Sequence, residues 1–169
     1  PLIFCRKNGR PADFGQIRFS EREYAEPSRF ITVADVTATQ PMAAFIEKNW
    51  KVHRPELLVS VTGGAQALVL PPPLQRAFSS GLVSLVTSAK CWMVTGGTNT
   101  GVMKIVGDVL SEHGLTHVPL IGITPLGCVN GREALQDVYG GDAKYGGAAP
   151  ASINGAPLNP SHTHFIFVD

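Results

Sequence analysis

Two short apolar runs that end in the same Thr-Gly-Gly tripeptide constrain this sequence more than any other feature. The first covers residues 57–64 and the second covers residues 92–97. β-Branched and aromatic residues before paired glycines are typical of a buried strand that leads into a tight turn. After the second turn, apolar residues recur at i, i+3, i+4, i+7 and i+8 from Val102 to Leu110, which predicts one buried helix face. The stretch therefore predicts a strand, a glycine turn and a helix.

The start of that helix has the chemistry of an anion site. Thr98, Asn99 and Thr100 are all good N-cap residues. A glycine turn that opens a helix presents free backbone N–H groups and a positive helix end to an anion, usually a phosphate. A tight turn without any ligand is the alternative. Neither turn has the G-x-G-x-x-G pattern of dinucleotide-binding folds, and neither has the P-loop pattern.

Length and composition favour one intracellular domain. The chain has 169 residues, 16% of them charged, and a net charge of +1, so nothing favours general binding to nucleic acid. Cys5, Cys91 and Cys128 are widely spaced without a C-x-x-C pair, which is typical of reduced thiols. No apolar run reaches the roughly 18 residues of a membrane span. The first residue is Pro rather than Met, so we expect a piece of a longer chain.

The hydrophobic pattern predicts an α/β fold with a mainly parallel sheet and flanking helices. Residues 1–30 are expected to be irregular, although weak alternation at 17–19 and 30–33 favours edge strands. Buried strands are predicted over 57–62, 92–95, 119–124 and 164–169, and helices over 41–52, 73–88, 98–113 and 133–138. Residues 139–160 are rich in Gly, Ala and Pro and are predicted to form a long loop. Because strands alternate with helices, right-handed crossovers and a parallel sheet are expected, and the continuous apolar run at 164–169 is typical of a central strand.

Five motifs in this order and spacing resemble the amino-terminal cytosolic region of melastatin-type (TRPM) cation channels. The motifs are Leu58-Val-Ser-Val-Thr-Gly-Gly-Ala65, Gly81-Leu-Val83, Trp92-Met-Val-Thr-Gly-Gly-Thr-Asn-Thr-Gly-Val-Met103, Ile121-Gly-Ile123 and Ser161-His-Thr-His-Phe-Ile-Phe-Val-Asp169. That region belongs to the SLOG group of Rossmann-like nucleotide-sensing domains, and the resemblance covers about residues 25–169. It implies an irregular segment over 1–30 and a SLOG domain over 31–169. The family continues beyond the point matching Asp169, so the resemblance implies an incomplete domain, its first half.

The resemblance also implies a ligand, because some members of the family bind an ADP-ribose-type nucleotide in the cleft. Carried over by motif, the implied ligand contacts are Thr62, Gly63, Gly64, Ala65 and Gln66, followed by Thr95, Gly96, Gly97, Thr98, Asn99 and Thr100. Ala67 stands where the family often has Asn, which removes one polar contact. The family also has a second glycine-rich phosphate loop and a basic ligand residue in the half that follows this stretch. Nucleotide is the one small-molecule ligand implied, and no resident cofactor is expected.

Catalysis and metal binding have little support in the sequence. SLOG enzymes that cleave nucleotide glycosidic bonds use a Gly-Gly-x-Gly-Thr-x-x-Glu loop, in which Asn99 here replaces the glycine before the threonine and Met103 replaces the glutamate. The general acid/base of such a hydrolysis is therefore missing, and no catalytic residue is predicted. His162 and His164 would share one face if both lay in a strand, but no third metal ligand accompanies them, so a loop histidine followed by one at a strand start is favoured. Lys104 is interpreted as a solvated helix residue rather than a phosphate ligand.

Two hypotheses of different classes remain open, with a nucleotide hydrolase as a disfavoured third. The first is a regulatory domain of a TRPM-type channel that senses ADP-ribose or a related nucleotide on the cytosolic side. The second is a SLOG module that has lost its ligand and acts as an interaction domain. Both predict that the domain works within a larger parent chain and within a homo-oligomer or other protein assembly.

Overall fold

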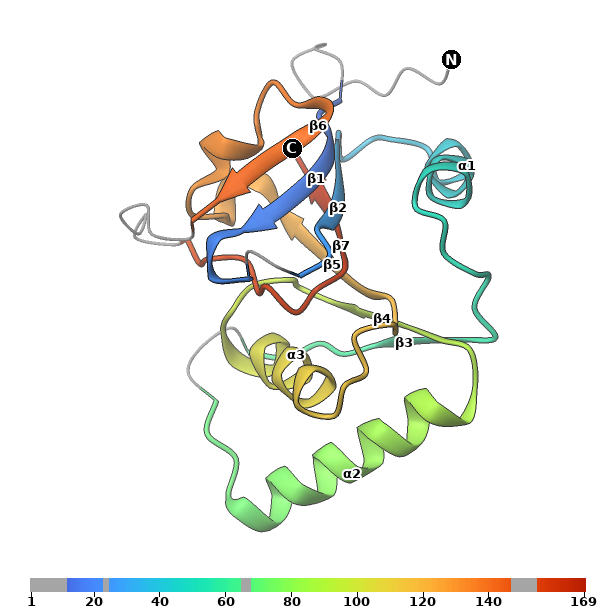
Figure 1. Ribbon diagram of the computed structural model, residues 1–169, viewed down its shortest axis with the longest axis vertical. Coiled ribbons are helices and arrows are strands. Elements are labelled where there is room, and N and C mark those ends of the chain that lie inside the picture. The colour runs from blue at the N-terminus through green and yellow to red at the C-terminus, as the bar shows by residue number, and fades with distance from the viewer. Residues whose placement is uncertain (1–11, 23–24, 65–67, 147–154) are drawn as a thin grey trace.

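The computed structural model describes residues 12–22, 25–64, 68–146 and 155–169. Figure 1 shows a twisted sheet with helices on both faces. The sheet contains β1 (Phe14–Phe19), β2 (Ser28–Val33), β3 (Leu57–Ser60), β4 (Cys91–Thr95), β5 (Leu120–Pro125), β6 (Tyr139–Tyr145) and β7 (His164–Val168). The helices are α1 (Thr39–Asn49), α2 (Pro72–Ser88) and α3 (Gly101–Glu112), with short 3-10 turns η1 (Ser20–Arg22), η2 (Leu126–Cys128) and η3 (Arg132–Leu135). None of the helices in the described ranges is long and apolar enough to cross a bilayer.

The strands lie in the order β3-β4-β5-β7-β2-β1-β6, and every neighbouring pair is parallel except β1 and β2. The predicted α/β class and the mainly parallel sheet are confirmed. β7 lies between β5 and β2, as its apolar run predicted, and Phe165 and Phe167 are fully buried. The expectation that this is only the first half of a domain stays a prediction.

Alternating side chains of the central strands separate the core into two faces. On one face Ile31, Ile121 and Ile166 pack with the half-buried residues of α1 and with Trp50. On the other face Met93 and Leu120 pack against α2 and α3, while the β1, β2 and β7 half is covered by η2, η3 and Leu158. The helix faces predicted from the 3.6-residue period are therefore the faces that contact the sheet.

The sequence interpretation was wrong in two segments. The first is the stretch expected to be irregular over 1–30: β1 and β2 both belong to the sheet, and β2 is internal rather than an edge strand. The alternation of β2 is weak because five of its six residues are buried, so both of its faces are apolar. Residues 1–11 of the stretch expected to be irregular lie outside the described residues.

The second is the long loop predicted over 139–160, which contains β6. This strand escaped prediction because it is an edge strand with only Ala143 and Tyr145 buried, so its sequence lacks an apolar alternation. The helix predicted near 133–138 is instead the four-residue 3-10 turn η3.

Candidate functional site

The two Thr-Gly-Gly turns leave the sheet at the same edge. β3 and β4 are parallel neighbours, with Ser60 opposite Val94, and the N–H of Val61 donates to the carbonyl of Val94 over 2.8 Å. Thr62, Gly63 and Gly64 are exposed. A Cβ placed on Gly63 would lie 3.1 Å from Cγ1 of Val102, so the first turn lies against the first turn of α3. The implied contacts Ala65 and Gln66 lie outside the described residues.

The second turn is folded into the core. Thr95 is 3% exposed, and its hydroxyl accepts a hydrogen bond from the N–H of Gly97 over 3.0 Å. Gly97 has φ +74°, and a Cβ on it would lie 2.8 Å from the Cα of Gly122. Only glycine therefore fits at position 97, and the reason is contact with a neighbouring strand.

The segment 155–163, which we call the C-terminal strap, covers the second turn. The N–H of Asn99 donates to the carbonyl of Pro157 over 2.7 Å, and the N–H of Asn159 donates to the carbonyl of Gly97 over 2.9 Å. The side chain of Asn159 also donates from Nδ2 to Oδ1 of Asn99 over 3.0 Å. The backbone N–H groups of Gly97 and Asn99 therefore already donate hydrogen bonds to acceptors within the protein.

His162 joins the strap to the end of β4. Its Nδ1 lies 3.2 Å from Oδ1 of Asn159 and its Nε2 lies 2.7 Å from the hydroxyl of Thr95. Oδ1 can only accept, so the network assigns the proton to Nδ1, and the hydroxyl of Thr95 donates to Nε2. Burial lowers the pKa of His162 to about 3, although the interaction with Asn159 opposes that shift. His162 is therefore a neutral core residue.

Helix α3 begins at this edge without a side-chain cap. Thr100 occupies the N-cap position, but its hydroxyl lies 3.0 Å from that of Thr98 and makes no cap hydrogen bond. The first bond from the helix to its cap runs from the N–H of Lys104 to the carbonyl of Thr100. The first-turn N–H groups therefore have no intrahelical acceptor. They lie beside the exposed turn formed by Thr62–Gly64.

Two further residues singled out in the sequence have ordinary partners. Nζ of Lys104 lies 2.5 Å from Oδ2 of Asp108 in an exposed ion pair. Met103 is 6% exposed, and a Cβ on Gly96 would lie 3.6 Å from its Cγ. The position that is a glutamate in the hydrolase loop is thus held by a buried thioether.

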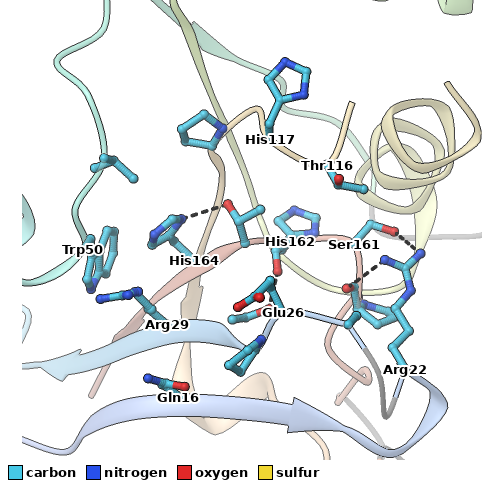
Figure 2. A pocket seen from close by; sticks show the side chains of 17 residues that line it. Gln16, Arg22, Glu26, Arg29, Trp50, Thr116, His117, Ser161, His162 and His164 are labelled. Carbon is cyan, nitrogen blue, oxygen red and sulfur yellow. Dashed lines mark hydrogen bonds between the residues drawn. The ribbon is translucent and has the colours of Figure 1, made fainter. Parts of the chain in front are cut away.

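A cavity, which we call the amino-edge cavity, lies at the opposite edge of the sheet. It has a volume of about 570 Å³ and is lined by the segments that precede β2, β5 and β7, together with Gln16, Arg22, Trp50 and Val52. Figure 2 shows Arg29 beside Trp50 at one side of the cavity and Arg22 at the other, with Glu26 between them. No sequence pattern predicted this cavity, because its polar residues come from separate loops.

His164 lines this cavity at the start of β7. Its ring lies 4.6 Å from that of Trp50, centroid to centroid, and its Nδ1 lies 2.8 Å from the hydroxyl of Thr163. Burial, assisted by the charge of Arg29, lowers the pKa of His164 to about 4. β7 begins only at His164, so His162 lies in the preceding loop and His164 at the start of a strand, as expected. In the described ranges no group of three His, Cys, Asp or Glu residues could hold a metal ion.

Comparison with known proteins confirms the resemblance. Residues 28–169 match the family described as SLOG in TRPM. The chain is 34% identical over 163 residues to the subfamily M member-like 2 transient receptor potential cation channel of Nematostella vectensis, covering 92% of this chain and 10% of that protein. It is 34% identical to human subfamily M member 6 over 94% of this chain and 8% of that protein. It is 32% identical to mouse subfamily M member 2 over 94% of this chain and 11% of that protein.

The chain thus spans about a tenth of the length of these relatives. The family match covers all of the parallel strands that form the carboxyl edge, together with α3 and the strap. The chain therefore belongs to the family of SLOG domains found in TRPM cation channels.

Proposed function

We propose that this chain is a regulatory domain on the cytosolic side of a TRPM-type cation channel, where it binds ADP-ribose or a related nucleotide through its phosphates. One observation carries the proposal: the exposed turn Thr62–Gly64 lies beside the uncapped amino end of α3. Unbonded N–H groups and a positive helix end favour a phosphate at that position. The channel context comes from relatives whose names describe cation channels.

The two turns have different roles in this proposal. We assign the phosphate contacts to Thr62, Gly63, Gly64 and the first turn of α3, which are accessible or unbonded. The second turn makes no phosphate contact in this proposal and instead packs beneath the site, because Thr95 and Gly97 are buried and bonded within the protein. Ligand binding would then order the exposed turn and change how the domain contacts the rest of the parent chain or a neighbouring subunit.

Isothermal titration calorimetry with ADP-ribose tests this site directly. Gly64→Glu places a negative charge at the turn, and its Cβ meets no atom within 4 Å, so the fold is preserved. We expect this change to abolish binding by charge repulsion with the phosphates. Gly81→Glu on the exposed face of α2 also has open space around its Cβ, and it is the matched control. Equal binding by both variants would rule out the site.

Gly97→Glu is unsuitable for the same test, because a side chain at Gly97 overlaps Gly122. Loss of binding by that variant would report unfolding rather than a lost contact. The titration belongs in the parent channel as well as in this chain, because the resemblance implies that the following half contributes to the cleft.

The domain is also proposed to be non-catalytic. Met103 offers no acid or base where the hydrolase loop has its glutamate, and it is buried under Gly96. Incubation with AMP, ADP-ribose and NAD should release neither free base nor ribose phosphate. Release that disappears when Thr95–Thr100 is mutated would contradict this.

A structural role is the second candidate, and one feature favours it. Leu58 of the edge strand β3 is 61% exposed, and Leu68, Val69 and Leu74, which follow β3 in the chain, are 44%, 87% and 54% exposed. An apolar edge of this kind is typical of a surface covered by another protein segment. If this role is the main one, Leu58→Lys should weaken subunit assembly of the parent channel, measured by size-exclusion chromatography, while Gly64→Glu has no effect on channel gating.

A further inference from the structure

We propose that the amino-edge cavity is a second ligand site, which binds a small sugar phosphate with its phosphate held by Arg29 at one side of the cavity. The site is separate from the carboxyl edge, because its lining precedes the parallel strands β2, β5 and β7 instead of following them. Its existence does not depend on nucleotide binding at the Thr-Gly-Gly turns.

The size of the cavity sets the size of the ligand. A volume of about 570 Å³ lies within the usual range of small-molecule sites. An inorganic phosphate alone would leave most of this space to water, whereas a phosphorylated pentose fills more of it. Trp50, Pro27 and Pro119 give the lining an apolar wall beside its polar groups.

The arginines give the cavity its charge. Both are half-buried, and in the described part of the chain neither pairs with a carboxylate within 4.0 Å. Arg29 donates from Nη1 to the carbonyl of Asn49. Arg22 donates to the carbonyl of Pro160 and to the hydroxyls of Ser111 and Ser161. Each guanidinium is thus held by neutral acceptors, which fix its position without neutralising it.

An oxyanion is the ligand chemistry that complements this arrangement. A guanidinium presents several donors in a rigid plane and binds phosphate more strongly than it binds neutral acceptors. Ser161 accepts from Arg22, so its own hydroxyl proton remains for donation to a ligand oxygen. The lowered pKa of His164, to which the charge of Arg29 contributes, agrees with a positive potential on this side.

Glu26 accounts for the sugar part of the proposal. Among the described lining residues it is the one acidic side chain, and it lies between the two arginines in Figure 2. A carboxylate repels phosphate but accepts hydrogen bonds from hydroxyl groups. A ligand that carries both phosphate and hydroxyls satisfies the whole lining, whereas a polyphosphate without hydroxyls would meet Glu26 unfavourably.

Calorimetric titration with ribose 5-phosphate and with ribose tests the proposal in the parent channel and in this chain. We expect ribose 5-phosphate to bind and ribose to bind at least tenfold more weakly. Arg29→Gln should weaken binding about tenfold or more, as expected for a lost hydrogen bond to a charged group. Glu26→Gln should strengthen binding several-fold, because it removes the negative charge and keeps an acceptor oxygen.

The control is Arg54→Gln, which changes an exposed arginine outside the lining and should leave affinity unchanged. Circular dichroism of each variant verifies folding, and Arg29→Lys retains the charge and should restore part of the binding. The NMR signal of the His164 imidazole should shift with ribose 5-phosphate and not with ribose.

Three outcomes would overturn the proposal. They are no binding of ribose 5-phosphate up to about 10 mM, equal affinity for ribose, and equal effects of Arg29→Gln and Arg54→Gln. Gly64→Glu separates this site from the first, because ribose 5-phosphate binding that vanishes in that variant would assign the ligand to the carboxyl edge.

Discussion

Gly97 and Gly64 belong to turns of the same composition, yet their surroundings give them opposite tolerance to a side chain. Gly97 has φ +74°, and its Cβ would overlap Gly122, whereas Gly64 faces open space. We expect Gly97→Ala to lower the free energy of unfolding by about 2 kcal/mol or more and Gly64→Ala to change it little. Urea denaturation of both variants measures this. Similar midpoints for the two would contradict the packing argument.

The buried histidines make the stability of the domain depend on pH. The folded-state pKa values of about 3 for His162 and about 4 for His164 lie below the ordinary 6.5. The unfolded chain therefore binds more protons at acidic pH, so stability is complete above about pH 6.5 and falls as the pH drops toward 4. Each unit of pKa shift is worth about 1.4 kcal/mol.

Urea midpoints at pH 7 and pH 5 test that dependence. The midpoint should be clearly lower at pH 5, and His164→Gln should reduce the difference. His53→Gln is the control, because His53 is exposed on the surface. A domain equally stable at both pH values would show that neither histidine is buried in its neutral form.

At the scale of elements, the strap and α3 fit together through one small residue. A Cβ on Gly107 would lie 2.5 Å from Oδ1 of Asn159, so the helix approaches the strap only because position 107 is glycine. Asn159 uses its side chain to hold Asn99, the N–H of Ser161 and His162. The strap therefore sets the position of the turn between β4 and α3.

Asn159→Ala removes these three hydrogen bonds at once. We expect a loss of about 3 kcal/mol in the free energy of unfolding and faster amide exchange at Gly97 and Asn99. Asn49→Ala is the matched control, because the Asn49 amide donates only to the carbonyl of Phe45 on an exposed helix surface. Unchanged exchange at Gly97 in the Asn159 variant would mean that the strap does not hold the turn.

The elements also separate what the sequence could predict from what it could not. Strands buried on both faces and helices with an apolar face, such as β7 and α3, were predictable because burial imposes a pattern on neighbouring residues. β6 was not, because an edge strand of exposed residues satisfies its backbone without an apolar pattern. The Thr-Gly-Gly turns follow strands and could be placed, whereas Arg22, Arg29 and His164 meet only through tertiary structure.

At the scale of the whole molecule, β7 joins two halves of one sheet. In the strand pairing of the sheet, the β3-β4-β5 half and the β2-β1-β6 half are joined through β7. Phe167 of β7 is fully buried and contacts Phe30 and Phe165. We expect Phe167→Ala to cost about 3–5 kcal/mol and to destabilise both halves together.

Two probes measure that cooperativity. Trp92 fluorescence reports the β4 half once Trp50 is replaced by Phe, and amide exchange in β1 reports the other half. Both should shift to lower urea by the same amount in Phe167→Ala. A shift in one probe alone would show that the halves unfold separately. Val36→Ala, at a side chain that is 87% exposed, serves as the control.

The position of β7 has a consequence for how the protein folds during its translation on the ribosome. β7 is translated after the six strands that it unites, so β5 and β2 leave the exit tunnel with their facing edges unpaired. Unpaired edges are the surfaces that chains use to aggregate. During this interval the nascent chain holds two unfinished half-sheets, and only the emergence of residues 164–168 closes the gap. Chaperone binding to stalled nascent chains should therefore persist until that strand has cleared the tunnel and then fall.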